Sequence, residues 1–267
     1  MTKEKICVCG DIHAKYHIIE QVEKLSKDYD KVIFLGDYVD DWNAIPEASY
    51  NTLKEVIDFR LANPDKVVCL WGNHDCGYFF GKQFHCSGYN PMTDSLLRPL
   101  FYKHEELFDM AYAPEGIDVL FTHAGLTKSW WNEYCSEVPH EGELKAKNYA
   151  DALNWALHHR NDDVQAEKIF QAFSNAGYAR GGHGNPSPTW ADLNELIADA
   201  IPNLTQVVGH TPIHTVTHYS LNEDTDFYAC DTHSLSKDGS NIGDNSLLVL
   251  EDFKFYEIGL DGKKLPW

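Results

Sequence analysis

The sequence predicts an α/β protein built on two mixed β-sheets that face each other and are flanked by helices. Two observations lead to this prediction. Strand-like and helix-like segments alternate through the first third of the chain, which is typical of a parallel sheet with crossover helices. From residue 205 onwards, short strand-like segments follow one another, which indicates a second sheet.

The first third is expected to form a strand–helix–strand–helix–strand unit. Residues 14–29 place apolar side chains on one helical face, and residues 46–61 do the same after Pro46, a favourable first residue for a helix. Between them, residues 31–35 are rich in β-branched and aromatic side chains, which suit a buried strand. Such a unit brings the carboxyl ends of its parallel strands to one edge of the sheet, where α/β proteins usually bind ligands.

The middle of the chain interrupts this alternation. Residues 76–115 hold a long irregular passage, followed by a helix from about Leu96 to Phe108 that Pro99 is expected to kink. Residues 117–122 are predicted to be the next strand.

An insertion at about 126–204 separates that strand from the one that follows it. Helices are expected at about 143–159, at 162–174 and around Leu193. We interpret the insertion as a helical cap that shapes access to a site, since long insertions beside sites often do so. The alternative is a helical layer that only packs on the sheet. The strands predicted after it are 205–208, 213–219, 226–230, 246–250 and 254–258.

Polar side chains that can bind metal ions recur where the predicted strands end. One such residue would be a weak signal, but five groups in this arrangement are hard to obtain by chance. Asp, His and Asn are all able to coordinate a divalent metal. The five groups are Asp11-Ile12-His13, Gly36-Asp37-Tyr38-Val39-Asp40, Gly72-Asn73-His74-Asp75, His123 in Thr122-His123-Ala124-Gly125, and Gly209-His210.

In these motifs the chain resembles the calcineurin-like metallophosphoesterases. The motifs extend from Asp11 to His210, so the resemblance covers most of the chain. It implies a four-layer αββα sandwich of two mixed sheets, formed as a single domain over residues 1–267 with the helical cap inserted in it.

The resemblance also implies two divalent metal ions that activate a water molecule for the hydrolysis of phosphoric esters. Two ions about 3.5–4 Å apart hold the phosphate oxygens and lower the pKa of a bound water. Imidazole ligands favour manganese, iron or zinc over magnesium, and manganese is the expected metal. The implied ligands are Asp11, His13 and Asp37 for one ion, and Asp37, Asn73, His123 and His210 for the other.

Three further residues are expected to take part in catalysis. His74 matches the family histidine that protonates the leaving oxygen, and Asp40 matches the carboxylate that pairs with it. Arg180 is a candidate phosphate contact, because a guanidinium group matches phosphate oxygens with two hydrogen bonds. The alternative for Arg180 is a solvated surface residue.

The motif Gly209-His210-Thr211-Pro212 resembles the phosphoprotein-phosphatase branch, which includes bacterial and phage serine/threonine phosphatases and diadenosine tetraphosphatases. That branch normally has arginine where this chain has Asp41, and the arginine grips phosphate. An acid there would repel a phosphate dianion. The resemblance implies a phosphoprotein substrate. Asp41 favours the alternative, a nucleotide, a dinucleoside polyphosphate or another phosphodiester, unless its side chain points away from the site.

Composition limits the partners and the compartment. The chain has 41 acidic and 22 basic residues, a formal net charge of −19, which excludes duplex nucleic acid as a favourable partner. A strand beginning by about Lys5 leaves no room for a signal peptide, so we expect a cytoplasmic protein that does not enter a membrane. Two other readings stay open: a metal-binding scaffold without catalysis, and a redox or zinc protein based on the seven cysteines.

Overall fold

The computed structural model describes residues 4–266, which divide into two compact units with one mixed sheet each. The first unit comprises the residues up to 108 together with 212–216 and those from 230 onwards. The second comprises 109–211 and 217–229. The prediction of an α/β fold with two mixed sheets and helices is confirmed.

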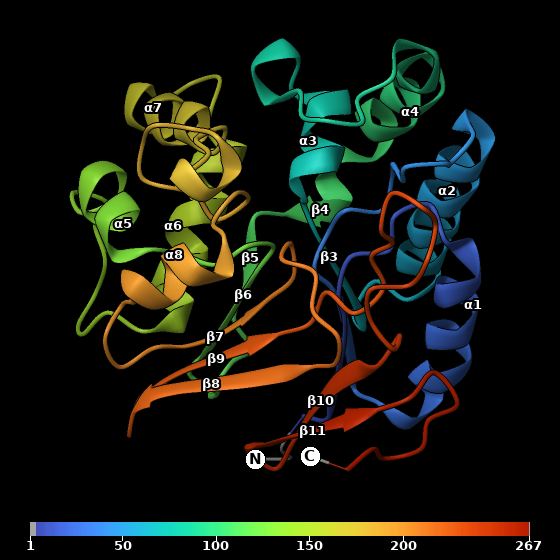
Figure 1. Cartoon of the computed structure of the whole chain (residues 1–267). Coiled ribbons are helices and arrows are strands. Elements are labelled where there is room, and N and C mark those ends of the chain that lie inside the picture. Colours follow the sequence, from blue (N-terminus) through green and yellow to red (C-terminus); the bar gives the residue numbers. More distant parts are fainter. Residues whose placement is uncertain (1–3, 267) are drawn as a thin grey trace. The chain divides into compact units, whose positions relative to one another are not determined.

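The sheet of the first unit has six strands in the order β11-β10-β1-β2-β3-β4 (Figure 1). Strands β1, β2 and β3 run parallel, as predicted from the alternation of strands and helices. Their inner positions are Val, Ile, Leu, Phe and Cys, which suits strands buried on both faces. The bounds are β1 Ile6–Cys9, β2 Lys31–Phe34, β3 Val67–Leu70, β4 Phe108–Asp109, β10 Leu247–Glu251 and β11 Lys254–Ile258.

Strands β10 and β11 correct one prediction, since the sequence had placed them in the second sheet. Strand β10 instead pairs antiparallel with β1, with Cys7 opposite Val249. The residues of β1 are fully buried, and an unpaired edge beside them would leave backbone groups without hydrogen bonds. Short spacing along the chain did not reveal which edge the last two strands would join.

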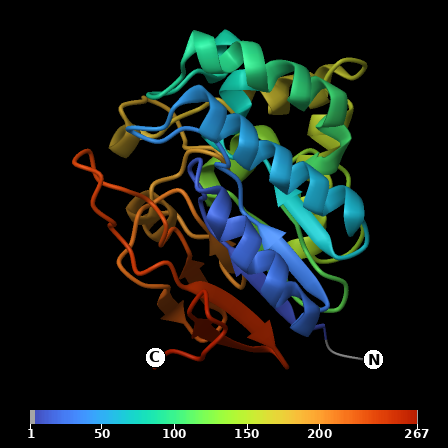
Figure 2. The same ribbon diagram turned by 90° about the vertical axis from the view of Figure 1, so that its right-hand side faces the viewer.

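Helices cover the first sheet. Helix α2 packs on β3, and α1 lies beside α2, as Figure 2 shows from the side of these helices. The predicted helix through Leu96 ends earlier than expected, because Phe108 begins β4 instead of continuing α4. Pro99 lies inside α4. The helices of this unit are α1 Tyr16–Leu25, α2 Pro46–Ala62, α3 Asn73–Phe79 and α4 Pro91–His104.

The sheet of the second unit has five strands in the order β5-β6-β7-β9-β8. Its three central strands run parallel, while β5 and β8 pair antiparallel at the two edges. The C-terminal ends of β6 and β7 are neighbours, which brings the residues after them together. The bounds are β5 Ala111–Tyr112, β6 Val119–Thr122, β7 Thr205–Val208, β8 Thr217–Asn222 and β9 Thr225–Ala229.

The insertion at 126–204 forms helices within the second unit. Helix α6 packs on β5 and β6, and α7 packs against α6 (Figure 1). Thr127 caps helix α5, because its hydroxyl accepts a hydrogen bond from the backbone of Trp130. This helix was not predicted from the sequence. The helices are α5 Lys128–Tyr134, α6 Ala146–His158, α7 Val164–Ala172 and α8 Leu193–Ala198.

None of the helices formed by residues 4–266 combines the length and the apolar character that crossing a lipid bilayer requires.

Candidate metal centre

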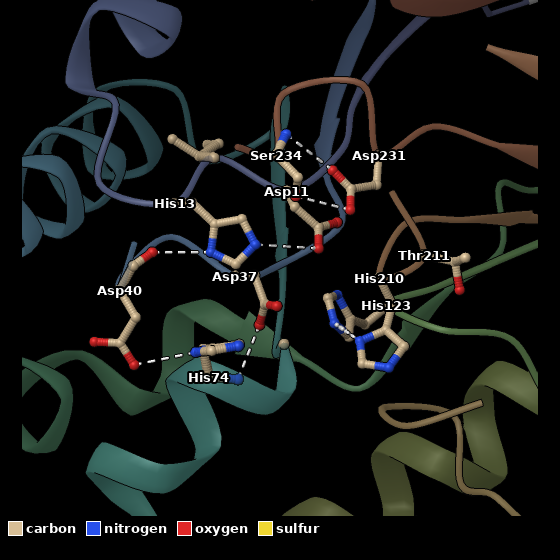
Figure 3. Close-up of polar contacts among 12 residues, drawn as sticks. Asp11, His13, Asp37, Asp40, His74, His123, His210, Thr211, Asp231 and Ser234 are labelled. Atoms are coloured by element: carbon tan, nitrogen blue, oxygen red, sulfur yellow. Dashed lines mark hydrogen bonds and ion pairs between the residues drawn. The ribbon is translucent and has the colours of Figure 1, made fainter. Parts of the chain in front are cut away.

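Two buried carboxylates follow the strands β1 and β2 of the first unit. Asp11 and Asp37 are each 1% exposed, and they lie in the loops that leave the carboxyl ends of these neighbouring parallel strands. Ligand atoms of Asp11, Asp37 and His13 all lie within 4.8 Å of one another. Figure 3 shows the three side chains converging, with Nε2 of His13 3.8 Å from Oδ2 of Asp11.

The imidazole of His13 is held in the tautomer that can bind a cation. Its Nδ1 lies 2.9 Å from the backbone oxygen of Asp40, which can only accept a hydrogen bond. Nδ1 therefore carries the proton, and Nε2 presents a lone pair toward Asp11. Burial lowers the pKa of His13, against the opposing effect of Asp37, so the ring is neutral.

Asp231 adds a third buried carboxylate to this part of the first unit. It is 1% exposed and accepts hydrogen bonds from the backbone nitrogen and the hydroxyl of Ser234, at 3.3 and 2.9 Å. Gly10 allows this approach, since a Cβ there would lie 2.1 Å from the backbone oxygen of Cys230. The negative charge of Asp231 acts on His13 and, like that of Asp37, partly offsets the lowering of its pKa by burial.

The donor set of this cluster fits a divalent cation. Carboxylate groups removed from water are costly unless a positive charge compensates them. Asp11, Asp37 and Asp231 are buried together with a neutral imidazole whose lone pair faces Asp11. Oxygen and imidazole ligands in this combination suit manganese, iron or zinc.

The turn after β3 packs directly against Asp37. A Cβ at Gly72 would lie 2.1 Å from Oδ1 of Asp37, and the backbone nitrogen of His74 donates to that same oxygen at 2.9 Å. Asn73, which stands between them, is buried as the first residue of α3. The structure therefore brings the predicted ligands of the first three strands to one edge of the sheet.

Asp75 supports this turn, a function that the sequence analysis did not recognise. Its carboxylate is fully buried and accepts hydrogen bonds from the backbone nitrogens of Asp37, Tyr38 and Gly72 at 2.7, 3.0 and 3.0 Å. Burial, with the nearby charge of Asp37, raises the pKa of Asp75 well above its usual value. Asp75 stands three residues after Gly72, the cap of helix α3, and this is where the acid of a capping box is found. That spacing could have indicated its supporting function from the sequence.

His74 and Asp40 form the predicted pair. Nδ1 of His74 lies 3.1 Å from Oδ2 of Asp40, and the hydroxyl of Tyr78 donates to the other carboxylate oxygen (Figure 3 shows the first contact). Burial works to lower the pKa of His74, but the charge of Asp37, the thiol of Cys86 and the hydrogen bond with Asp40 raise it well above its usual value. The raised pKa favours the protonated ring, whose Nε2–H can donate a proton.

The loops that carry these groups are conformationally strained. His13, Asp37 and Asp40 all have positive φ, at 47°, 52° and 61°. A residue other than glycine in this region costs on the order of 1–3 kcal/mol, and such residues concentrate at functional sites. The strain is consistent with loops shaped for ligand placement.

The second unit contains a pair of buried imidazoles. His123 follows β6 and His210 follows β7, and these strands are parallel neighbours. Nε2 of His123 lies 3.2 Å from Nδ1 of His210 (Figure 3), and the backbone nitrogen of Gly209 donates to the oxygen of His123 at 2.7 Å. Both side chains are buried, and Trp190 meets the ring of His210 edge-on at 5.8 Å.

Arg180 lies beside His210 within the second unit. Its Nη2 is 3.2 Å from Oδ2 of Asp192 and donates to the hydroxyl of Thr211 at 3.0 Å and to the backbone oxygen of His210 at 3.3 Å. Its Nε is buried and has no hydrogen-bond partner within residues 4–266. Arg180 is therefore fixed by neighbouring residues and is no freely solvated surface group.

The sequence motifs thus form two clusters, one in each unit. The first contains Asp11, His13, Asp37 and the pair of His74 with Asp40, and the second contains His123, His210 and Arg180. The seven cysteines are all present as free thiols.

Comparison with known proteins supports a single family. The sequence profile described as calcineurin-like phosphoesterase matches residues 4–214. A stretch of 76 residues is 33% identical to the serine/threonine-protein phosphatase 2B catalytic subunit A1 of Saccharomyces cerevisiae. This stretch is 28% of the chain and spans 13% of that phosphatase.

Solved structures of phosphatases have a similar fold. The cold-active protein-tyrosine phosphatase of a psychrophilic Shewanella species superposes with a TM-score of 0.57 at 19% identity, covering 98% of this chain and 80% of that one. A protein serine/threonine phosphatase from Saccharomyces cerevisiae, described as similar to human phosphatase PP5, gives 0.50 at 15% identity, covering 92% and 72%. At such identities the likeness concerns the fold.

Proposed function

Because the chain belongs to the calcineurin-like phosphoesterase family, we propose that it is a hydrolase of phosphoric esters with two divalent metal ions. The observation that carries the proposal is the cluster of buried carboxylates around the lone pair of His13. The proposed ligands are Asp11, His13 and Asp37 for one ion, and Asp37, Asn73, His123 and His210 for the other. Manganese is the proposed metal, with iron or zinc as alternatives.

Bound ions would supply a low-pKa water as nucleophile and neutralise the phosphate oxygens. The carboxylates of Asp11 and Asp37 contribute the negative charge that holds such ions in place. The backbone nitrogen of Asp37 donates to Asp75, which holds the loop, and the backbone nitrogen of His74 donates to the Asp37 carboxylate, which fixes the orientation of that side chain.

In our proposal, His74 donates the Nε2 proton to the leaving oxygen of the substrate. Asp40 and Tyr78 support this role, because they hold Nδ1 and leave Nε2 as the exchangeable site. The raised pKa keeps that proton on the ring until the leaving oxygen develops negative charge.

Arg180 is proposed as a contact to the phosphate through its Nε edge. Nη2 is occupied by Asp192 and Thr211, while Nε is a buried donor without a hydrogen-bond partner within residues 4–266. A donor in that state gains a hydrogen bond when an anionic oxygen arrives.

The proposed substrate class is a phosphoprotein of the serine or threonine type. The sequence match to a yeast serine/threonine phosphatase subunit supports it. Nucleotides, dinucleoside polyphosphates and phosphodiesters form the second candidate class. The absence of the phosphate-gripping arginine at position 41 favours it, because these substrates carry less charge on the reacting phosphorus.

The proposal is tested with purified protein, first stripped by chelator and then loaded with Mn²⁺. We expect p-nitrophenyl phosphate hydrolysis to disappear on chelation and to return with Mn²⁺. Phosphoserine, phosphothreonine and phosphotyrosine peptides, diadenosine tetraphosphate and bis-p-nitrophenyl phosphate then rank the substrate classes. Metal binding without turnover of any of these esters would instead support a scaffold.

A further inference from the structure

Two loops of the first unit carry the proposed ligands of the first metal ion, and backbone hydrogen bonds join them. The loop after β1 donates from the backbone nitrogens of Ile12 and His13 to the oxygen of Asp37, at 3.0 and 2.9 Å. The nitrogen of Ala14 donates to the oxygen of Tyr38 at 2.9 Å. A shift of either loop therefore disturbs the other.

The same two loops hold the strained residues. Ala14 has a φ of 59°, next to His13 at 47°, and on the other loop Asp37 and Asp40 are also left-handed. Conformations of this kind persist only where surrounding contacts over-determine them. Side chains that link the two loops are accordingly part of what keeps the ligands in place.

Lys15 and Asp41 form such a link. Nζ of Lys15 lies 3.1 Å from Oδ2 of Asp41, with the two side chains only 12% and 10% exposed. Nζ also donates to the backbone oxygens of His13 at 3.3 Å and Ile12 at 3.4 Å. An ammonium group has three hydrogens, so these three acceptors saturate Lys15.

The pairing changes the significance of Asp41. From the sequence, Asp41 is expected to repel a phosphate dianion, but in the structure the ammonium of Lys15 balances its charge. Its other oxygen accepts a hydrogen bond from the backbone of Trp42 at 2.6 Å. Both oxygens of Asp41 are thus engaged within the loops.

We propose that Lys15 and Asp41 are a positioning pair for the first metal site. Asp41 follows Asp40, whose backbone oxygen receives the Nδ1 proton of His13, and Lys15 holds the backbone oxygen of His13 itself. The ion pair therefore fixes both ends of the linkage that directs Nε2 of His13 toward Asp11. This inference rests on the proposed function, since it concerns residues around the proposed ion.

The test measures Mn²⁺ affinity of the full chain by isothermal titration, with electron paramagnetic resonance to count free Mn²⁺. Asp41→Asn keeps the size of the side chain and its bond to Trp42, and Lys15→Met removes the ammonium. We expect each change to lower the affinity for one of the bound Mn²⁺ ions by about 10- to 100-fold. This is the usual effect of losing a residue that supports a metal ligand. The double variant should be no weaker than the worse single variant, because both remove one interaction.

Two controls separate positioning from general stability. Lys54→Met breaks the exposed ion pair with Asp58 on α2 and should leave Mn²⁺ affinity unchanged. Lys15→Arg keeps the charge and should recover most of the affinity lost in Lys15→Met. Titrations are made well below the melting temperature of each variant, and if Lys15→Met does not fold, Asp41→Asn and Lys15→Arg still decide the question.

The outcomes distinguish failure of the proposed function from failure of the positioning pair. If the wild-type chain binds no Mn²⁺, the proposed function fails. If it binds Mn²⁺ and Asp41→Asn binds equally well, only the positioning pair is overturned. An increase in substrate KM with unchanged metal affinity would also overturn it, since Lys15 would then contact the substrate.

Discussion

The two clusters differ in charge and in how they are held. The cluster of the first unit is anionic. The buried carboxylates of Asp11, Asp37 and Asp40 stand on two loops that contain strained residues and are joined by hydrogen bonds and an ion pair. The cluster of the second unit is a pair of imidazoles directly after two neighbouring strands, supported by one fixed arginine. An anionic cluster depends on a cation for its stability, whereas an imidazole pair does not. The first unit should therefore respond more strongly to changes at its ligands.

Asp37→Asn is expected to have the largest effect, because this carboxylate is proposed to bind both ions and is also hydrogen-bonded to the turn after β3. Loss of the charge should reduce kcat by about 10⁴-fold, equivalent to several kcal/mol of transition-state stabilisation. Bound Mn²⁺, measured by mass spectrometry of the metal, should fall with it.

His123→Asn is the matched change in the second unit. It should release no more than one of the two ions, and it should lower kcat by less than Asp37→Asn does. Equal losses from the two changes would contradict the difference between the clusters.

His74→Asn should reduce kcat by about 10²- to 10⁴-fold for alkyl phosphates and by less for p-nitrophenyl phosphate, whose leaving group needs little protonation. Steady-state kinetics with both esters measure the difference. Metal content should stay at the wild-type level, since the carboxylates of the first unit remain.

A loss of metal in step with activity would mean that His74 supports the ions and is no acid. Tyr78→Phe provides a milder change to the same chain of hydrogen bonds, because it removes only the donor to Asp40. Its effect on kcat should lie between those of the wild type and His74→Asn.

Arg180→Met is expected to reduce kcat/KM by about 10²-fold, the usual effect of removing one donor to a developing anion. Stopped-flow or steady-state assays with a phosphopeptide measure it. Arg160→Met, on the helical part of the same unit, is the control and should leave kcat/KM unchanged.

Asp192→Asn tests how Arg180 acts. If the ion pair only holds the guanidinium in place, this change should cause a smaller loss than Arg180→Met. If both variants lose thermal stability but keep the wild-type kcat/KM, Arg180 does not contact the phosphate.

The smallest expected effect concerns acid stability and His233. Burial lowers the pKa of this fully buried imidazole to about 4, while its ordinary value is 6.5. The unfolded chain therefore binds the proton more readily, and the free energy of unfolding should fall as pH drops below 6.5, with no further loss below about 4. Between pH 7.5 and 5 the loss from this one group is about 2 kcal/mol.

Urea unfolding at both pH values measures this loss, and His233→Asn should remove it while keeping a donor for Asn245. Exposed His183→Asn is the control. An unchanged pH dependence in His233→Asn would mean that other groups cause the acid sensitivity.

The parallel core strands of the first unit and the polar residues that follow them could be predicted from local sequence patterns. Apolar runs such as Val32-Ile33-Phe34 and the Gly-Asp turn after them are local patterns, and local patterns predict strands and turns well. Helix α2 was predicted nearly to the residue, because Pro46 marks its start and its apolar positions repeat at helical spacing.

The way in which distant segments combine became visible in the folded structure and not before. Strand β10 joined β1, Asp231 came to lie near His13, and Asp41 met Lys15, each through contacts between residues far apart in sequence or on separate loops. Sequence spacing carries no signal for such contacts, because they depend on which surfaces remain unpaired once the strands and helices have formed. The charge at Asp41 illustrates the consequence: its identity was visible in the sequence, but its neutralisation by Lys15 arises from the folded loops.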